Sequence, residues 1–123
     1  MHFQEDRNNT LIRINAWEPG TLTINGNKHQ DNLIFTESEI LAFPLPKSVQ
    51  QLTAANIDEF CKIGSDIFIL GTGMKQVFPN RDVLEAATRH NIAIEVMDTR
   101  AACRIFSLLA SEGRKILTIL FID

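Results

Sequence analysis

The feature that most constrains this fold is a regular alternation, between residues 66 and 122, of apolar runs with amphipathic stretches. The runs are apolar on nearly every position, and they are short enough to be strands buried on both faces. They lie at 67–70, 92–97 and 116–122. The stretches between them carry apolar residues at helical spacing. This order predicts β-α-β-α-β units with right-handed crossovers, in which helices cover the faces of the sheet.

Residues that favour helix ends flank the predicted helices. A side-chain oxygen at the N-cap accepts a hydrogen bond from a free backbone N–H, and a residue that tolerates positive φ closes the other end. The predicted starts are Thr53, Pro79-Asn80 and Asp98-Thr99, and the predicted ends are Gly64, Asn91 and Gly113. The first of these helices precedes the strand at 67–70.

The first third of the chain has the pattern of antiparallel strands. Thr21–Ile24 alternates polar and apolar residues, which is typical of a half-buried strand. Asn25-Gly26 follows, and it is the strongest short-range signal for a β-hairpin because both residues tolerate positive φ. We also expect strands at 11–14, 32–36 and 39–43, a turn at 17–20, and an end to this region at Pro44 and Pro46.

These patterns predict an α/β fold: a single three-layer domain with a mixed central β-sheet, an N-terminal antiparallel hairpin region and a βαβαβ C-terminal part. We expect residues 1–10 to be a flexible N-terminus and residues 11–123 to form the domain. The sequence of 123 residues is 45% hydrophobic and 22% charged. It therefore has enough apolar surface to fold without disulfides or a metal.

Charge and hydropathy exclude some classes of function. The net charge of −3 argues against a broad nucleic-acid-binding face, although it leaves room for a small basic pocket. No apolar run approaches the roughly 20 residues that span a bilayer, so we expect no membrane insertion. The first nine residues are polar and lack an apolar signal core, which predicts a cytoplasmic protein.

Residues that carry chemistry are few and scattered. Cys61 and Cys103 lie far apart and show no metal-ligand spacing, and each lies among apolar residues, as a small buried hydrophobe would. The three histidines are dispersed, and no nucleophile has a base near it in sequence. We therefore predict no catalytic residues, no metal site and no cofactor, and the sequence favours a non-enzymatic protein while leaving an activity open.

A ligand site is predicted at one edge of the sheet. Gly71, Thr72 and Gly73 follow one buried strand, and Thr99 and Arg100 follow the next. The carboxyl ends of parallel strands meet at the same edge, which is where α/β sheets bind ligands. Glycines let a ligand approach the backbone, and a helix N-terminus favours anions.

Three arginines near this edge make an anion the expected ligand. Arg100 lies in the first turn of a helix, where a cation opposes the helix dipole, and a bound anion would offset that cost. Arg104 follows one turn later, and Arg81 begins the preceding helix. The alternatives are that the glycine turn is structural and that Arg100 pairs with Asp98 or Glu95.

Four segments follow one another in a fixed order along the chain: Ile67–Gly73, Glu95–Thr99, Ala101–Arg104 and Leu109–Arg114. Together they resemble one family of small domains, which includes mitochondrial complex I assembly factor 3 and many uncharacterised bacterial proteins. The likeness runs from about Thr21 to the end of the chain. One departure is Ser107, where the family favours Asn.

The resemblance implies a three-layer α/β domain. The mitochondrial members of the family are linked to respiratory complex I assembly and have no established enzymatic activity. We therefore expect a non-enzymatic accessory or assembly protein that acts through protein partners. The alternative is a binder or enzyme for a small anionic ligand at the predicted edge. The sequence leaves open whether the protein forms a homo-oligomer. The family pattern also matches at Arg104, Glu112 and Arg114. These three residues form either a functional site or a structural network of ion pairs.

Overall fold

A computed structural model describes residues 11–123 of the chain. The N-terminus predicted to be flexible, residues 1–10, lies outside the described residues. The strands are β1 (Ile14–Glu18), β2 (Thr21–Ile24), β3 (Asn27–His29), β4 (Leu33–Thr36), β5 (Ile67–Gly71), β6 (Ile94–Met97) and β7 (Ile116–Leu120). The helices are the 3-10 turn η1 (Val49–Gln51), α2 (Ala54–Cys61), α3 (Arg81–Arg89) and α4 (Thr99–Ser111).

The alternating part of the chain forms the central sheet, in the order β4-β7-β5-β6. β5 pairs in parallel with both β6 and β7, whereas β4 runs antiparallel to β7, so the sheet is mixed as predicted. All five residues of β7 are buried. A central strand covered on both faces has no solvent side, which explains why its sequence does not alternate.

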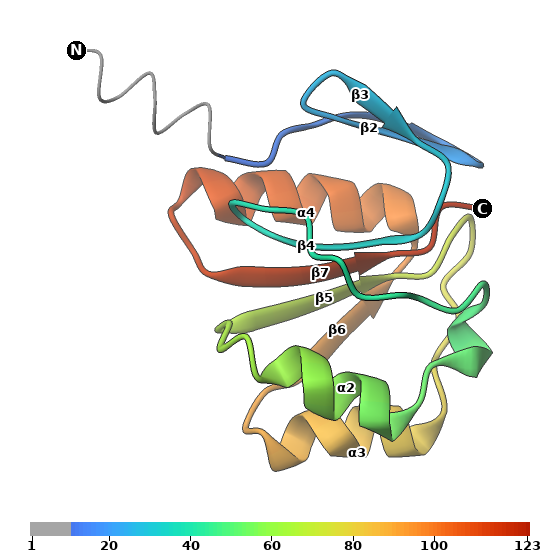
Figure 1. The fold of residues 1–123 in the computed structure, drawn as a ribbon, viewed down its shortest axis with the longest axis vertical. Helices are drawn as coiled ribbons and strands as arrows, with labels where there is room; N and C mark the ends of the chain where they lie inside the picture. The colour runs from blue at the N-terminus through green and yellow to red at the C-terminus, as the bar shows by residue number, and fades with distance from the viewer. Residues whose placement is uncertain (1–10) are drawn as a thin grey trace.

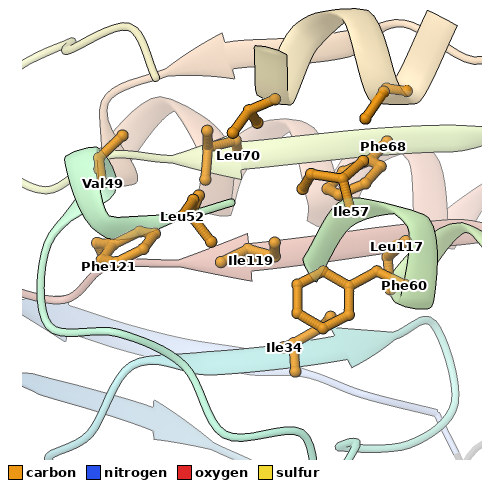
Figure 2. Close-up of a cluster of buried hydrophobic side chains, with 13 residues drawn as sticks. Ile34, Val49, Leu52, Ile57, Phe60, Phe68, Leu70, Leu117, Ile119 and Phe121 are labelled. Carbon is orange, nitrogen blue, oxygen red and sulfur yellow. The ribbon is translucent and has the colours of Figure 1, made fainter. Parts of the chain in front are cut away.

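Two sets of elements cover the two faces of this sheet (Figure 1). α2 and α3 pack on one face, where Figure 2 shows Ile57 and Phe60 of α2 against Phe68 and Leu117 of the sheet. On the other face lie α4 and the separate sheet β1-β2-β3, whose Leu22 joins the same apolar cluster as the sheet residues beneath α4. The predicted three-layer α/β architecture is confirmed.

The hairpin predicted at Asn25-Gly26 is also confirmed. Asn25 and Gly26 have φ of +50° and +81°, and Ile24 pairs with Asn27 across the two-residue turn. The preceding strand differs from its prediction, because β1 includes Trp17 and leaves only Pro19 and Gly20 for the turn.

The prediction of a strand at 39–43 is wrong. Only Ile40 forms a bridge, to Phe35, after which the chain leaves the edge of the sheet. Leu41, Phe43 and Leu45 pack instead against the apolar cluster under α2 and α3. Alternate burial along an extended segment therefore produced the strand-like pattern without a strand ladder.

The helix starts are capped as the sequence predicts at two places. The Thr53 hydroxyl accepts the N–H of Asn56, and the Asp98 carboxylate accepts the N–H of Ala101 at 2.8 Å. The Asn80 side chain makes no cap bond and instead donates to the Gln50 carbonyl. Asn91 has φ of +62°, as expected for the residue that follows α3.

One polar side chain in the core has no partner, and it provides a test of the packing. Thr118 lies on β7, is fully buried, and its hydroxyl makes no hydrogen bond. An unpaired buried hydroxyl costs about 1–3 kcal/mol. We expect Thr118→Val to raise the free energy of unfolding by about 1 kcal/mol and the melting temperature by about 4 °C, measured by urea and thermal denaturation.

Thr72→Val is the matched control, because the Thr72 hydroxyl donates to the Lys75 carbonyl at 2.6 Å and accepts the Val77 N–H at 3.0 Å. That variant should destabilise the protein. If Thr118→Val were destabilising to the same degree, the Thr118 hydroxyl would have a partner and its environment here would be wrong.

Candidate functional site

The glycines of the predicted ligand loop lie against the chain itself. A Cβ on Gly71 would lie 2.7 Å from Cδ2 of Leu120 and 3.0 Å from Cβ of Ala102. Gly73 has φ of +99°, and a Cβ there would lie 2.5 Å from the carbonyl oxygen of Asp123. Both glycines are needed because the C-terminal segment and α4 approach this backbone closely.

The two threonines of the predicted edge also have internal partners. The Thr99 hydroxyl donates to the Phe121 carbonyl at 2.7 Å and accepts the N–H of Gly73 at 2.8 Å, in a fully buried position. The hydroxyl of Thr72 bonds within its own loop, and its N–H donates to the Met97 carbonyl at 2.9 Å. These bonds tie the ends of β5, β6 and β7 to the start of α4.

The N-terminus of α4 has partners within the chain for three of its N–H groups. Thr99 N–H donates to the Gly73 carbonyl at 2.8 Å, and Ala102 N–H donates to the Asp98 carbonyl at 3.0 Å. The Asp98 carboxylate takes the N–H of Ala101 and supplies the negative charge that the helix dipole favours.

The structure therefore divides the predicted site residues among three places. Gly71, Thr72, Gly73 and Thr99 are buried at the sheet edge. Arg81 begins α3, on the opposite face of the central sheet from α4. Arg100 and Arg104 are exposed on the outer side of α4. A ligand role for the loop residues stays a prediction, whereas the two arginines line a groove that sequence reasoning missed.

This groove, which we call the α4–β1 groove, lies between the outer side of α4 and strand β1. Its volume is about 480 Å³. On the helix side, the spacing i, i+3, i+4, i+7 places four side chains in one stripe. The lining residues are Ile14, Asn15, Ala16 and Trp17 from β1, and Arg100, Cys103, Arg104 and Ser107 from α4.

Trp17 and Arg100 form the central contact of the groove. The Arg100 guanidinium carbon lies 5.2 Å from the centroid of the Trp17 ring, which is cation–π distance. The Trp17 indole N–H donates to the Ile122 carbonyl at 3.0 Å and so holds the ring in place. Among the described residues Arg100 makes no ion pair with Asp98 or Glu95, so the pairing considered for it is absent there.

Cys103 lies between the two arginines and is half-buried. Burial raises the pKa of its thiol to about 11, and the charges of Arg100 and Arg104 offset only part of that rise. Burial, followed by the charge of Asp58, also raises the pKa of Cys61. A raised pKa disfavours the thiolate that nucleophilic chemistry requires.

Other charged groups form short-range pairs. Glu112 lies 4.0 Å from Arg114, just beyond the end of α4. Asp58 of α2 meets His90 at 2.9 Å and Arg89 at 4.0 Å, which links α2 to the end of α3. That exposed cluster lies beside a cavity of about 260 Å³ that His90 and Cys61 line.

Within residues 11–123, no group of three or more His, Cys, Asp or Glu side chains is placed to hold a metal ion. In the same part of the chain, no helix is long and apolar enough to cross a membrane. α4, with 13 residues, falls short of the roughly 20 that a spanning helix needs.

The fold and groove define a class: a small layered α/β domain with a mixed sheet and a surface groove beside its last helix. Within that class, the chain belongs to the family described as "Protein of unknown function (DUF498/DUF598)", which matches residues 14–121. The resemblance drawn from the four sequence segments is confirmed.

Two curated relatives show the range of this similarity. The rat "NADH dehydrogenase [ubiquinone] 1 alpha subcomplex assembly factor 3" is 29% identical over 105 residues, which are 84% of this chain and 56% of the rat protein. The chain thus spans little more than half of that relative. The "13 kDa major membrane protein" of Francisella tularensis subsp. holarctica is 21% identical over 117 residues, which are 94% of this chain and 95% of that one.

A solved structure agrees with the fold. The NMR structure of a Xanthomonas campestris protein is 30% identical and has a TM-score of 0.82, over 90% of this chain and 84% of that one.

The buried Thr99 hydroxyl should be a large contributor to stability. Thr99→Val leaves the Gly73 N–H and the Phe121 carbonyl without their partner in a buried position. We expect the free energy of unfolding to fall by about 2–5 kcal/mol, since each orphaned group costs about 1–3 kcal/mol. Urea denaturation measures this value. Thr99→Ser keeps the hydroxyl and should recover most of it, and equal loss in both variants would contradict the role assigned to these bonds.

The raised pKa of Cys103 gives a pH-dependent prediction. In a Cys61→Ala background, the rate of alkylation by iodoacetamide should rise about tenfold per pH unit from pH 7 to pH 10 without a plateau, because the thiolate fraction keeps rising below the pKa of about 11. A rate that levels off near pH 7 would show a reactive thiolate and contradict this environment.

Proposed function

We propose that this chain is a non-enzymatic accessory protein of the assembly-factor type, which acts by binding a protein partner in the α4–β1 groove. The observation that carries the proposal is the cation–π contact between Arg100 and Trp17 within that groove. Tryptophan and arginine are the residues most enriched among those that dominate binding energy at protein interfaces. Trp17 is already fixed by its bond to Ile122, so little conformational entropy is lost when a partner docks.

The relatives support the same class of function. The rat relative is named as an assembly factor of an NADH dehydrogenase subcomplex. As part of the proposal, a role in assembling a respiratory complex extends to this chain. The cytoplasmic location expected from the sequence likewise stays a prediction.

Site-specific photo-crosslinking in the cells of origin tests the proposal. Ser107, exposed within the groove, is replaced by the photo-crosslinking residue p-benzoylphenylalanine. We expect one discrete crosslinked species of higher mass, and we expect Arg100→Gln with Arg104→Gln to reduce its yield about tenfold, as loss of interface anchors does.

The control carries the same residue at Glu85, which is exposed on α3 on the other face of the central sheet. It should not give that species. The proposal fails if position 107 gives no discrete product, or if positions 107 and 85 give the same product in equal yield.

A small anionic ligand is the second candidate, because Arg100 and Arg104 line the groove and make no ion pair among the described residues. Thermal unfolding against phosphates, nucleotides, carboxylates and acyl carriers separates the two candidates. A ligand at 100 times its dissociation constant adds about 2.7 kcal/mol to stability. A melting shift that disappears in Arg100→Gln would favour the ligand; our proposal predicts no such shift.

A further inference from the structure

The β1 side of the groove belongs to the edge strand of the small sheet. Four consecutive residues of β1, Ile14–Trp17, line the α4–β1 groove. A β-bulge between Ile14 and Ala16 interrupts the regular alternation of side chains along these four residues. β1 pairs with β2 on one side alone in the sheet β1-β2-β3. Its other edge therefore leaves backbone N–H and C=O groups without a strand partner.

The groove continues toward the end of α4. A second hollow of about 350 Å³ is lined by residues 11–14 and by Ser107, Ala110 and Ser111. It shares Ile14 and Ser107 with the first hollow, so the two lie side by side along α4. From Arg100 to Ser111 the helix rises about 16 Å, which accommodates an extended segment of about five residues.

Both charged residues on the helix side of the groove are basic. α4 carries Arg100 and Arg104 and no acidic residue, in a chain whose net charge is −3. Neither arginine makes an ion pair among the described residues. Arg13 is exposed on the strand side of the second hollow. A guanidinium in cation–π contact with an aromatic ring keeps N–H donors, so Arg100 can also bind a carboxylate.

From these observations we infer that the groove takes an extended acidic segment of a protein partner, which adds a strand to the free edge of β1 while its carboxylates pair with Arg100 and Arg104. This inference rests on the proposed function and names the chemistry of the partner. Strand addition supplies affinity through main-chain hydrogen bonds, and side-chain pairs supply specificity.

A polypeptide fits this groove better than a small anion does. An anion would satisfy the arginines and leave the row of backbone groups on β1 unpaired. An extended peptide can pair with the backbone groups of β1 and with the arginines of α4. Its side chains alternate, so that every second one faces α4. Arg100 and Arg104 lie about 6 Å apart along the helix axis, close to the spacing of about 7 Å between alternate residues of a strand.

Synthetic peptides test the inference with the full chain. The probe is an acetylated heptapeptide in which glutamate alternates with valine, and the matched peptide has glutamine in place of glutamate. Trp17 is the only tryptophan of the sequence, so its fluorescence reports binding in the groove. We expect the glutamate peptide to bind about tenfold or more tightly than the glutamine peptide, as charge-assisted bonds predict.

Two changes test the charged contacts and the main-chain contacts separately. Arg100→Gln with Arg104→Gln should abolish the preference for glutamate, whereas Arg114→Gln, which lies beyond α4 and pairs with Glu112, should keep it. A glutamate peptide N-methylated at alternate amides on the edge that would face β1 should lose about tenfold or more in affinity, because it cannot complete the ladder. Unchanged melting temperatures show that the variants fold.

The inference is overturned if the glutamate peptide does not bind, if the glutamine peptide binds equally well, or if N-methylation has no effect. It is also overturned if Glu5→Gln with Asp6→Asn tightens peptide binding about tenfold, because the occupant would then be the chain's own N-terminal segment. A dimer in sedimentation that the double arginine variant dissociates would make the occupant a second copy. None of these results removes the crosslink at position 107, so the proposed function is tested separately.

Discussion

The hydroxyl of Thr99 joins the segments on which the rest of this structure depends. It connects the Gly73 N–H after β5 with the Phe121 carbonyl after β7, and it does so from the first residue of α4. The same C-terminal segment holds the small sheet, because the Ile122 carbonyl accepts the Trp17 indole N–H and the Gly20 N–H. α4 and β1 are thus fixed to one short stretch of chain, and the α4–β1 groove is the consequence.

Much of the fold could be predicted because its signals are local. A central strand that is buried on both faces has an unbroken run of apolar residues in its sequence. Asn25 and Gly26 adopt the positive φ that their hairpin needs. The small sheet was harder to place. Trp17 is fixed by a carbonyl 105 residues away, and nothing in the sequence around it reveals that partner.

The candidate site shows the same limit. Arg100 and Arg104 were predicted as a basic pair from their helical spacing. The β1 residues that line the other side of the groove come from a distant part of the chain. Gly71 and Gly73 were predicted to let a ligand approach the backbone closely. Local sequence cannot tell whether a ligand or the chain itself makes that approach, and here Leu120 and Asp123 do. The groove that remains combines a fixed tryptophan, two arginines and an edge strand.

Backbone amide NMR of the full chain, titrated with the glutamate–valine peptide, tests the central claim most directly. The account predicts the largest chemical-shift changes at residues 11–17 and 100–107, together with slower hydrogen exchange of β1 amides as a new ladder forms. Changes that are largest in the loop between β5 and α3, or on α2 and α3, would contradict the assignment of the α4–β1 groove as the binding surface.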